Sequence, residues 1–213
     1  MGHDSLTGAG EYPCLPGAAE VVGFWQAAGP DKWFAKDDGF DAEIVRRFEA
    51  AHHAAARGEL AEWEQSAQGA LALLILLDQF PRNIWRGSAH AFATDPLALA
   101  VADRAIAAGH DMATEPALRL FFYLPFEHSE ALADQDRCLA LCRALDEESS
   151  SAWSRWAELH RDIIVRFGRF PHRNACLGRA STAEELAFLR GRLCRVIRPK
   201  GHLPWHAQSV TTS

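Results

Sequence analysis

The sequence has no apolar run long enough to cross a membrane. Its central run, Leu71–Leu77, contains seven residues, whereas a transmembrane helix needs roughly 20. The first twenty residues also lack the apolar segment of a secretory signal, because several glycines and prolines interrupt them. These absences argue against a membrane protein and against secretion, and they favour a cytoplasmic location.

Motifs for metal ligands are sparse as well. The five cysteines are an odd number and contain no CxxC pair, so neither a disulfide framework nor a zinc site is expected. Cys138 and Cys142 lie one helical turn apart, which is typical of small apolar residues on a buried helix face. His128, His160 and His172 are scattered along the chain and belong to no HExxH motif. We therefore expect no bound metal and no cofactor.

Signatures of two common kinds of catalysis or ligand binding are missing too. The chain has no GxSxG sequence, so the presence of Ser129 next to His128 does not indicate a serine hydrolase. It has no glycine-rich phosphate loop, since Gly87 and Gly168 are isolated. The formal net charge of −6 argues against a general nucleic-acid-binding protein.

What the sequence does contain is charge that is unevenly distributed. Residues 160–200 hold ten Lys or Arg and three Asp or Glu, a local balance of +7 in a chain whose net charge is −6. This pattern indicates an acidic body with an arginine-rich end region. One interpretation is that the two parts neutralise each other across helix contacts, and the other is that the arginines bind an anion.

The periodicity of apolar residues predicts an all-α protein. No stretch has the pattern of a strand, and short polar turns separate the apolar segments, so we expect about eight helices in antiparallel hairpins. This arrangement is tetratricopeptide-like, although no clean period of 34 residues is present. We expect one helical domain, 18–198, between a loose arm, 1–17, and a loose tail, 199–213. The predicted helices are 18–28, 41–56, 60–80, 95–108, 116–124, 135–145, 152–167 and one from about 182 to 197.

Local signals set several of these boundaries. Asp41 and Asp95 are expected to cap the starts of their helices. Pro81 and Pro125 are expected to end theirs, because proline lacks the N–H that a helix interior requires. Two overlapping capping boxes in Ser181–Glu185 mark the start of the last helix. Two further expectations are that Trp33 and Phe34 anchor a charged loop on the core, and that Glu147–Ser151 is a polar turn.

Asp78 is the unusual residue of the central helix. It follows the apolar run Leu71–Leu77, so it should be buried, and it lies near the helix C-terminus, where the helix dipole disfavours a negative charge. A buried carboxylate needs a cation. Arg82 and Arg86 are the nearest candidates in the sequence.

Three polar blocks follow the ends of apolar helices: Asp78–Asn83, Pro125–Glu130 and Arg166–Asn174. A helical scaffold can bring such helix ends together, so we expect the three blocks to line a shared site.

Four motifs, in this order, resemble the signature blocks of one bacterial family, that of domain of unknown function 924. They are LLDQFPRNI (76–84), AFATD (91–95), YLPFEHSE (123–130) and RFGRFPHRN (166–174). The resemblance extends from about Phe24 to Leu189. It implies an all-helical, tetratricopeptide-like fold and assigns no biochemical activity.

The blocks supply two sets of candidate site residues. For acid–base chemistry the candidates are Glu127, His128 and His172, because a carboxylate and an imidazole can exchange protons near neutral pH. For ligand binding the candidates are Asp78, Arg82, Arg86, His160, Arg166, Arg169 and Arg173, because planar guanidinium groups suit carboxylate or phosphate.

Three hypotheses remain open from the sequence. The first is a module that binds an anionic small molecule or an acidic peptide group. The second is a hydrolase- or transferase-type enzyme that uses Glu127, His128 or His172, with arginines orienting an anionic substrate. The third is structural: Asp78 and Arg82 form an internal ion pair, His160 is a core residue, Asp162 holds Arg166, and the blocks only lock the helices together. In that case the working surface lies elsewhere, around Trp33 and Phe34 or in the tail with Trp205. No nucleic-acid or membrane partner is expected, and the sequence does not indicate an oligomeric state.

Overall fold

The computed structural model describes residues 15–191, and this part of the chain is all helical, with no strand, which confirms the predicted fold class. Short 3-10 or π-helical turns occupy 61–65, 75–79, 89–92 and 171–173. The α-helices are α1 (Ala18–Ala28), α2 (Pro30–Trp33), α3 (Asp38–Ala56), α4 (Ala67–Leu74), α5 (Phe80–Ile84), α6 (Asp95–Ala107), α7 (Pro116–Glu127), α8 (Leu132–Ser149), α9 (Trp153–Phe167) and α10 (Ala183–Arg190).

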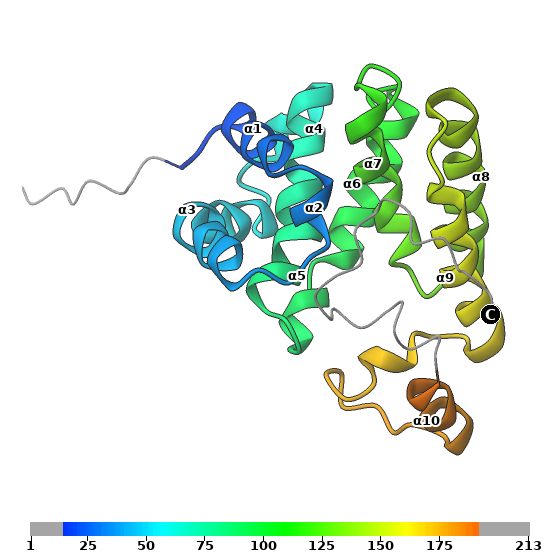
Figure 1. The fold of residues 1–213 in the computed structure, drawn as a ribbon. Coiled ribbons are helices and arrows are strands. Elements are labelled where there is room, and N and C mark those ends of the chain that lie inside the picture. The colour runs from blue at the N-terminus through cyan, green and yellow to red at the C-terminus, as the bar shows by residue number, and fades with distance from the viewer. Residues whose placement is uncertain (1–14, 192–213) are drawn as a thin grey trace, which may run out of the picture.

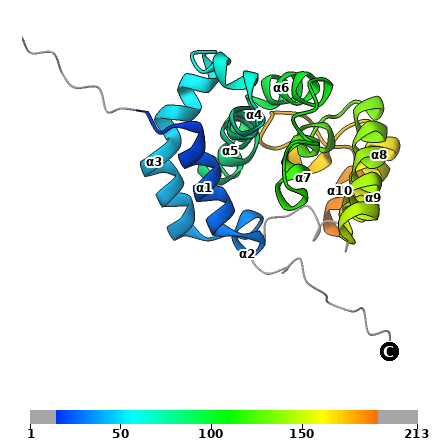
Figure 2. The same ribbon diagram turned by 90° about the horizontal axis from the view of Figure 1, so that it is seen from above.

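The helices follow one another from one end of the molecule to the other. Helices α1 and α3 form one end, α8 and α9 form the opposite end, and α4 to α7 lie between them (Figures 1 and 2). One hydrophobic core runs through this body, and a small second cluster, built around Ile163, Phe170 and Phe188, joins α10 and its loop to α9. None of the helices in the described part is long and apolar enough to span a bilayer.

The central helix does not end at Pro81 as predicted. Residues Ile75–Gln79 form a π-helical turn, in which the N–H of Phe80 reaches back to the carbonyl of Ile75, and the chain then continues as α5 through Ile84. Pro81 occupies the first turn of α5, where its missing N–H is tolerated. The π turn thus carries the helix past the proline.

Two side chains complete the backbone hydrogen bonding that Pro81 disrupts. Pro81 has no N–H to offer to a carbonyl of the preceding turn, to which Leu76 and Leu77 belong. The Nδ1–H of His52 donates to the carbonyl of Leu76 at 2.8 Å, and the hydroxyl of Thr94 donates to that of Leu77 at 2.5 Å. The start of α6 and the C-terminal part of α3 are therefore bonded directly to the central helix.

Several predicted boundaries were also wrong. Asp37, not Asp41, caps α3, since its carboxylate accepts the N–H groups of Gly39 and Phe40. Asp95 does not cap α6 either, because Thr94 occupies the cap position. Helix α4 begins at Ala67 rather than at residue 60, after a 3-10 turn.

The helices before and after the second polar block, α7 and α8, are longer than predicted. Helix α7 continues through Pro125 to Glu127. Helix α8 spans Leu132–Ser149, so most of the expected polar turn at 147–151 is helical. Cys138 and Cys142 lie on the buried face of α8, as predicted, with their sulfur atoms 3.9 Å apart.

The segment with Trp33 and Phe34 is not a loop, because Trp33 ends α2. Its indole N–H donates to the carbonyl of Trp25 at 2.6 Å, and its ring packs edge-on against Phe121 at 4.9 Å. This segment is therefore anchored on the core, as expected.

Thr182 caps α10 in a capping box with Glu185, as predicted. Helix α10 ends at Arg190 and the backbone of Gly191 is extended, whereas the predicted helix continued to about 197. Residues 192–197 lie outside the described residues, as do Cys14, Cys194 and Trp205. The predicted tail, 199–213, and all of the predicted arm except 15–17 also lie outside them.

Replacing Thr94 with valine tests the repair of the helix at Pro81. Valine keeps the shape of threonine but leaves the carbonyl of Leu77 without its donor at a buried position. We expect the free energy of unfolding to fall by about 1–3 kcal/mol in urea titrations. Thr114→Val is the matched control, because Thr114 bonds only a carbonyl of its own turn, at a partly exposed position. Equal losses in the two variants would contradict the assigned role of Thr94.

Candidate functional site

Asp78 is completely buried and lies in the π turn of the central helix. Its Oδ1 atom lies 3.1 Å from Nη1 of Arg82 and 2.8 Å from Nδ1 of His128, and its Oδ2 atom accepts a hydrogen bond from Gln79 at 2.6 Å. Despite its burial, Arg82 and His128 hold the pKa of Asp78 at about 2, so the carboxylate is ionised at neutral pH. The pair of Asp78 and Arg82 predicted from the sequence is therefore present.

A second carboxylate joins two arginines from different polar blocks. Asp95, at the start of α6, lies 2.9 Å from Nη2 of Arg82 and 3.1 Å from Nη1 of Arg173. The guanidinium of Arg173 also lies 4.6 Å from the ring centroid of Phe92 and 4.7 Å from that of Phe170. Two rings and one carboxylate thus hold the buried guanidinium of Arg173 in place.

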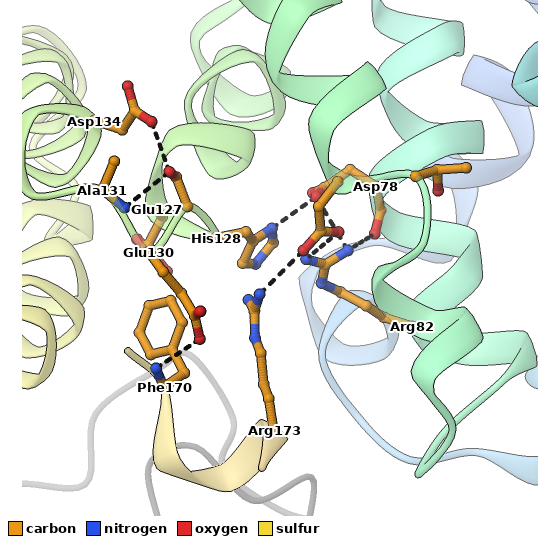
Figure 3. A network of polar contacts seen from close by, with 12 residues as sticks. Asp78, Arg82, Glu127, His128, Glu130, Ala131, Asp134, Phe170 and Arg173 are labelled. Carbon is orange, nitrogen blue, oxygen red and sulfur yellow. Dashed lines mark hydrogen bonds and ion pairs between the residues drawn. The ribbon is translucent and has the colours of Figure 1, made fainter. Parts of the chain in front are cut away.

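Figure 3 shows His128 pointing from the end of α7 toward Asp78, while Arg173 rises from the 3-10 turn at Pro171–Arg173 toward the same place. The central helix, the end of α7 and the loop after α9 therefore meet here. We call the group formed by Asp78, Arg82, Asp95, Glu127, His128, His160, His172 and Arg173 the polar cluster.

Glu127 and His160 form a second carboxylate–imidazole contact in the polar cluster. The Nδ1 atom of His160 lies 3.2 Å from Oε1 of Glu127 and 2.9 Å from the carbonyl of Trp156, to which it donates. Burial raises the pKa of Glu127 from its ordinary value. His160 is thus neither a fully buried core residue nor a free one, because its side chain is 18% exposed and bound on one side.

His172 has no hydrogen-bond partner for its buried Nδ1 atom. Burial, together with the positive charges of Arg173 and Arg82, lowers its pKa from 6.5 to about 2. Its ring lies 5.6 Å from that of Phe170. His172 is therefore a neutral imidazole in a positive electrostatic environment.

Glu130 fixes the loop that carries His172 and Arg173. Its carboxylate accepts the backbone N–H of Phe170 at 2.8 Å and two hydrogen bonds from Arg179, at 2.7 and 2.9 Å (Figure 3 shows the Phe170 bond). The second polar block thus positions the third.

Three arginines predicted from the sequence do not join the polar cluster. Arg86 binds Asp41, with Nε 2.8 Å from Oδ2, and has no contact with Asp78. Arg166 pairs with Glu184 at 2.8 Å rather than with Asp162, and it is half exposed.

Arg169, the third, forms two hydrogen bonds to Glu185, at 2.6 and 2.8 Å. The sequence spacing of these three arginines favoured a place in the shared site. Each instead forms an ion pair with a carboxylate of another segment.

Asp95 is the cluster residue that sequence reasoning missed as a ligand of arginine. Its place before Pro96 had suggested a helix cap instead. The signal that pointed to it was the motif AFATD (91–95), which also contains Phe92, the ring against Arg173. Asp95, which lies outside the three polar blocks, binds the two arginines of the polar cluster, Arg82 and Arg173.

Within residues 15–191, no group of three or more His, Cys, Asp or Glu side chains has the geometry to hold a metal ion. A surface hollow of about 430 Å³ lies away from the polar cluster, between α1, α2 and the start of α3, and Phe24, Lys32 and Phe40 contribute to its lining. The polar cluster is more enclosed, although the side chains of Arg82, Asp95, His128 and His160 remain 16–20% exposed.

Comparison with known proteins confirms the family resemblance. A family model described as a bacterial protein of unknown function (DUF924) matches residues 21–192. A solved structure, that of the protein of unknown function ATU0120 from Agrobacterium tumefaciens, is 53% identical, with a TM-score of 0.77. The match covers 81% of this chain and 96% of that one. None of the curated proteins matches the chain.

Because the fold lowers the pKa of His172, we expect the folded protein to lose stability in mild acid. Below pH 6.5 the unfolded chain binds a proton that the folded protein does not take up until about pH 2. The unfolded state therefore gains protons first, and stability falls as the pH falls. We expect this group to remove about 2 kcal/mol between pH 7 and pH 5 in urea titrations, and His172→Gln to abolish that part of the pH dependence.

The exposed His90 provides the control for this prediction. The variant His90→Gln should keep the full pH dependence of the original protein. If His172→Gln keeps it as well, His172 is not held neutral by the fold.

Asp78→Asn should destabilise the protein by about 3 kcal/mol, because it removes the buried anion that faces Arg82 and His128. The control is Glu184→Gln, which breaks an exposed ion pair with Arg166 and should cost less than about 1 kcal/mol. Chemical denaturation measures both, and similar losses would show that Asp78 is not the electrostatic centre of the polar cluster.

Proposed function

The chain belongs to the DUF924 family of bacterial proteins of unknown function, and we propose, from the geometry of the polar cluster, that it binds a small anionic molecule or the acidic group of a peptide. The observation that carries the proposal is the environment of His172. Burial is the main cause of the low pKa of this imidazole, and the positive charges of Arg173 and Arg82, which lower it further, would stabilise a negative charge brought next to it.

Unused hydrogen-bond donors support the same proposal. The Nε atom of Arg173 is buried and has no partner, although the same guanidinium binds Asp95 through Nη1. A buried donor without an acceptor costs free energy that a ligand oxygen would recover. The neighbouring Nδ1 of His172 is also buried without a partner, and in the tautomer with the proton on Nδ1 it would donate to the same ligand.

The rigidity of Arg173 also favours ligand binding. Because Phe92 and Phe170 lie against the guanidinium, its planar group is already oriented and loses little freedom when an anion binds. A carboxylate or phosphate is the group that such a fork binds best.

The charge of the polar cluster limits how many negative charges the ligand can carry. Asp78 and Asp95 already neutralise two guanidinium charges, and they would repel a ligand with several negative charges placed between them. The proposal therefore favours a ligand that presents one carboxylate or one phosphate group near His172 and Arg173. Arg86, Arg166 and Arg169, which pair with other carboxylates, are not part of it.

A thermal-shift series with phosphate, sulfate, acetate and a short acidic peptide tests the proposal. A ligand at 100 times its dissociation constant stabilises the folded state by about 2.7 kcal/mol, so the melting temperature should rise with its concentration. The same series in added sodium chloride separates binding from ionic strength. If none of these anions raises the melting temperature more than sodium chloride does, the proposal fails.

Two arginine variants locate the binding group. Arg173→Lys keeps the positive charge but loses the planar fork, so it should fold and lose most of the anion-dependent shift. Arg166→Gln, whose half-exposed side chain pairs with Glu184 outside the polar cluster, should keep the whole shift. Loss in both variants, or in neither, would count against binding at Arg173.

A further inference from the structure

In the pair of His128 and Asp78, Nδ1 of the imidazole is hydrogen-bonded to the carboxylate, whereas Nε2 has no hydrogen-bond partner in the described part of the chain. Asp78 is ionised and can only accept a hydrogen bond, so the 2.8 Å contact requires a proton on Nδ1 of His128. The proton of a neutral imidazole is then on Nδ1, and Nε2 carries a free electron pair. Among residues 15–191, no group forms a hydrogen bond with Nε2, and the side chain is 16% exposed.

Asp78 is itself held firmly enough to fix this tautomer. Its backbone belongs to the π turn, Gln79 donates to its second oxygen, and Arg82 contacts its first oxygen and its carbonyl. A carboxylate with these two further contacts, to Gln79 and Arg82, cannot rotate away from His128 without losing them. The orientation of the imidazole is therefore determined by the central helix.

From this geometry we infer that His128 is an acid–base residue, with Asp78 as its positioning residue, and that it removes a proton from an O–H group of the anion bound beside it. This inference rests on the proposed anion site, which brings the reacting group to Nε2. The proton moves from the ligand oxygen to Nε2, the electron pair of the O–H bond stays on that oxygen, and Asp78 stabilises the imidazolium formed.

The charged groups around His128 suit this role at neutral pH. Burial and the positive charge of Arg82 lower its pKa, whereas Asp78 and Asp95 raise it, and the net direction is downward. The ring is therefore neutral at pH 7 and able to accept a proton. Of the other acid–base candidates, His172 is too weak a base at pH 7, and Glu127 is already in contact with His160.

Acylation with diethyl pyrocarbonate tests the state of Nε2 directly, because this reagent attacks the free electron pair of a neutral imidazole. In the full-length protein at pH 7, mass spectrometry should find His128 modified at least about tenfold faster than His172, whose ring has far less basicity. The rate at His128 should fall on acidification with a midpoint below pH 6.5. A slow or absent reaction at His128 would overturn the inference.

Two variants separate positioning from mere stability. In Asp78→Asn the amide can donate to Nδ1, which moves the proton to Nε2 and should abolish the fast reaction and shift its pH profile. Glu184→Gln, which makes the same carboxylate-to-amide change in an exposed pair outside the polar cluster, should leave the rate at His128 unchanged. If Asp78→Asn does not fold, nitrogen-15 spectra of imidazole-labelled wild-type protein give the same answer, since Nε2 must be unprotonated at pH 7.

Inorganic phosphate distinguishes a failure of this inference from a failure of the anion site. If both hold, phosphate protects His128 from acylation. If acylation is fast but phosphate neither protects nor stabilises, His128 is basic but the anion site is refuted, and the inference falls with it. If phosphate stabilises the protein while His128 stays unreactive, the anion site stands and the acid–base role is refuted.

Discussion

The structure depends on one buried negative charge, the carboxylate of Asp78 inside the central helix. An ionised group at such a position is tolerated only when cations and hydrogen-bond donors surround it. Gln79 comes from the same turn, Arg82 from α5 and His128 from the end of α7. Arg82 in turn needs Asp95, which binds Arg173 from the loop after α9. Satisfying one charge thus draws four segments of the chain together.

The uneven charge of the sequence is resolved by the same kind of contact. Three arginines of the C-terminal region bind carboxylates of earlier segments: Arg161 binds Asp136, Arg173 binds Asp95 and Arg179 binds Glu130. The expectation that acidic and basic parts neutralise each other holds for these three, whereas Arg166 and Arg169 bind Glu184 and Glu185 of their own region. Buried polar atoms without a hydrogen-bond partner remain in this region, and Nδ1 of His172 and Nε of Arg173 are two of them.

The sequence predicted the helical class and the family well, because apolar periodicity and motif order depend on neighbouring residues. It predicted the Asp78–Arg82 pair for the same reason. It failed at Pro81 and for Arg86, because the outcome depended on distant groups: Thr94 and His52 supply the donors that let the helix continue, and Asp41 takes Arg86. The contact between His128 and Asp78, fifty residues apart, had no local signal at all.

The π turn at Ile75–Gln79 also fixes the angular phase of everything that follows it on the central helix. A π turn is equivalent to one extra residue in a regular helix, and each residue of an α-helix rotates the next by about 100°. Deleting a single residue here would turn Arg82 away from Asp95, and Arg86 away from Asp41. The length of this segment, and not only its composition, is therefore under constraint, and relatives that keep the polar cluster should tolerate substitutions in the turn far better than a change in its residue count.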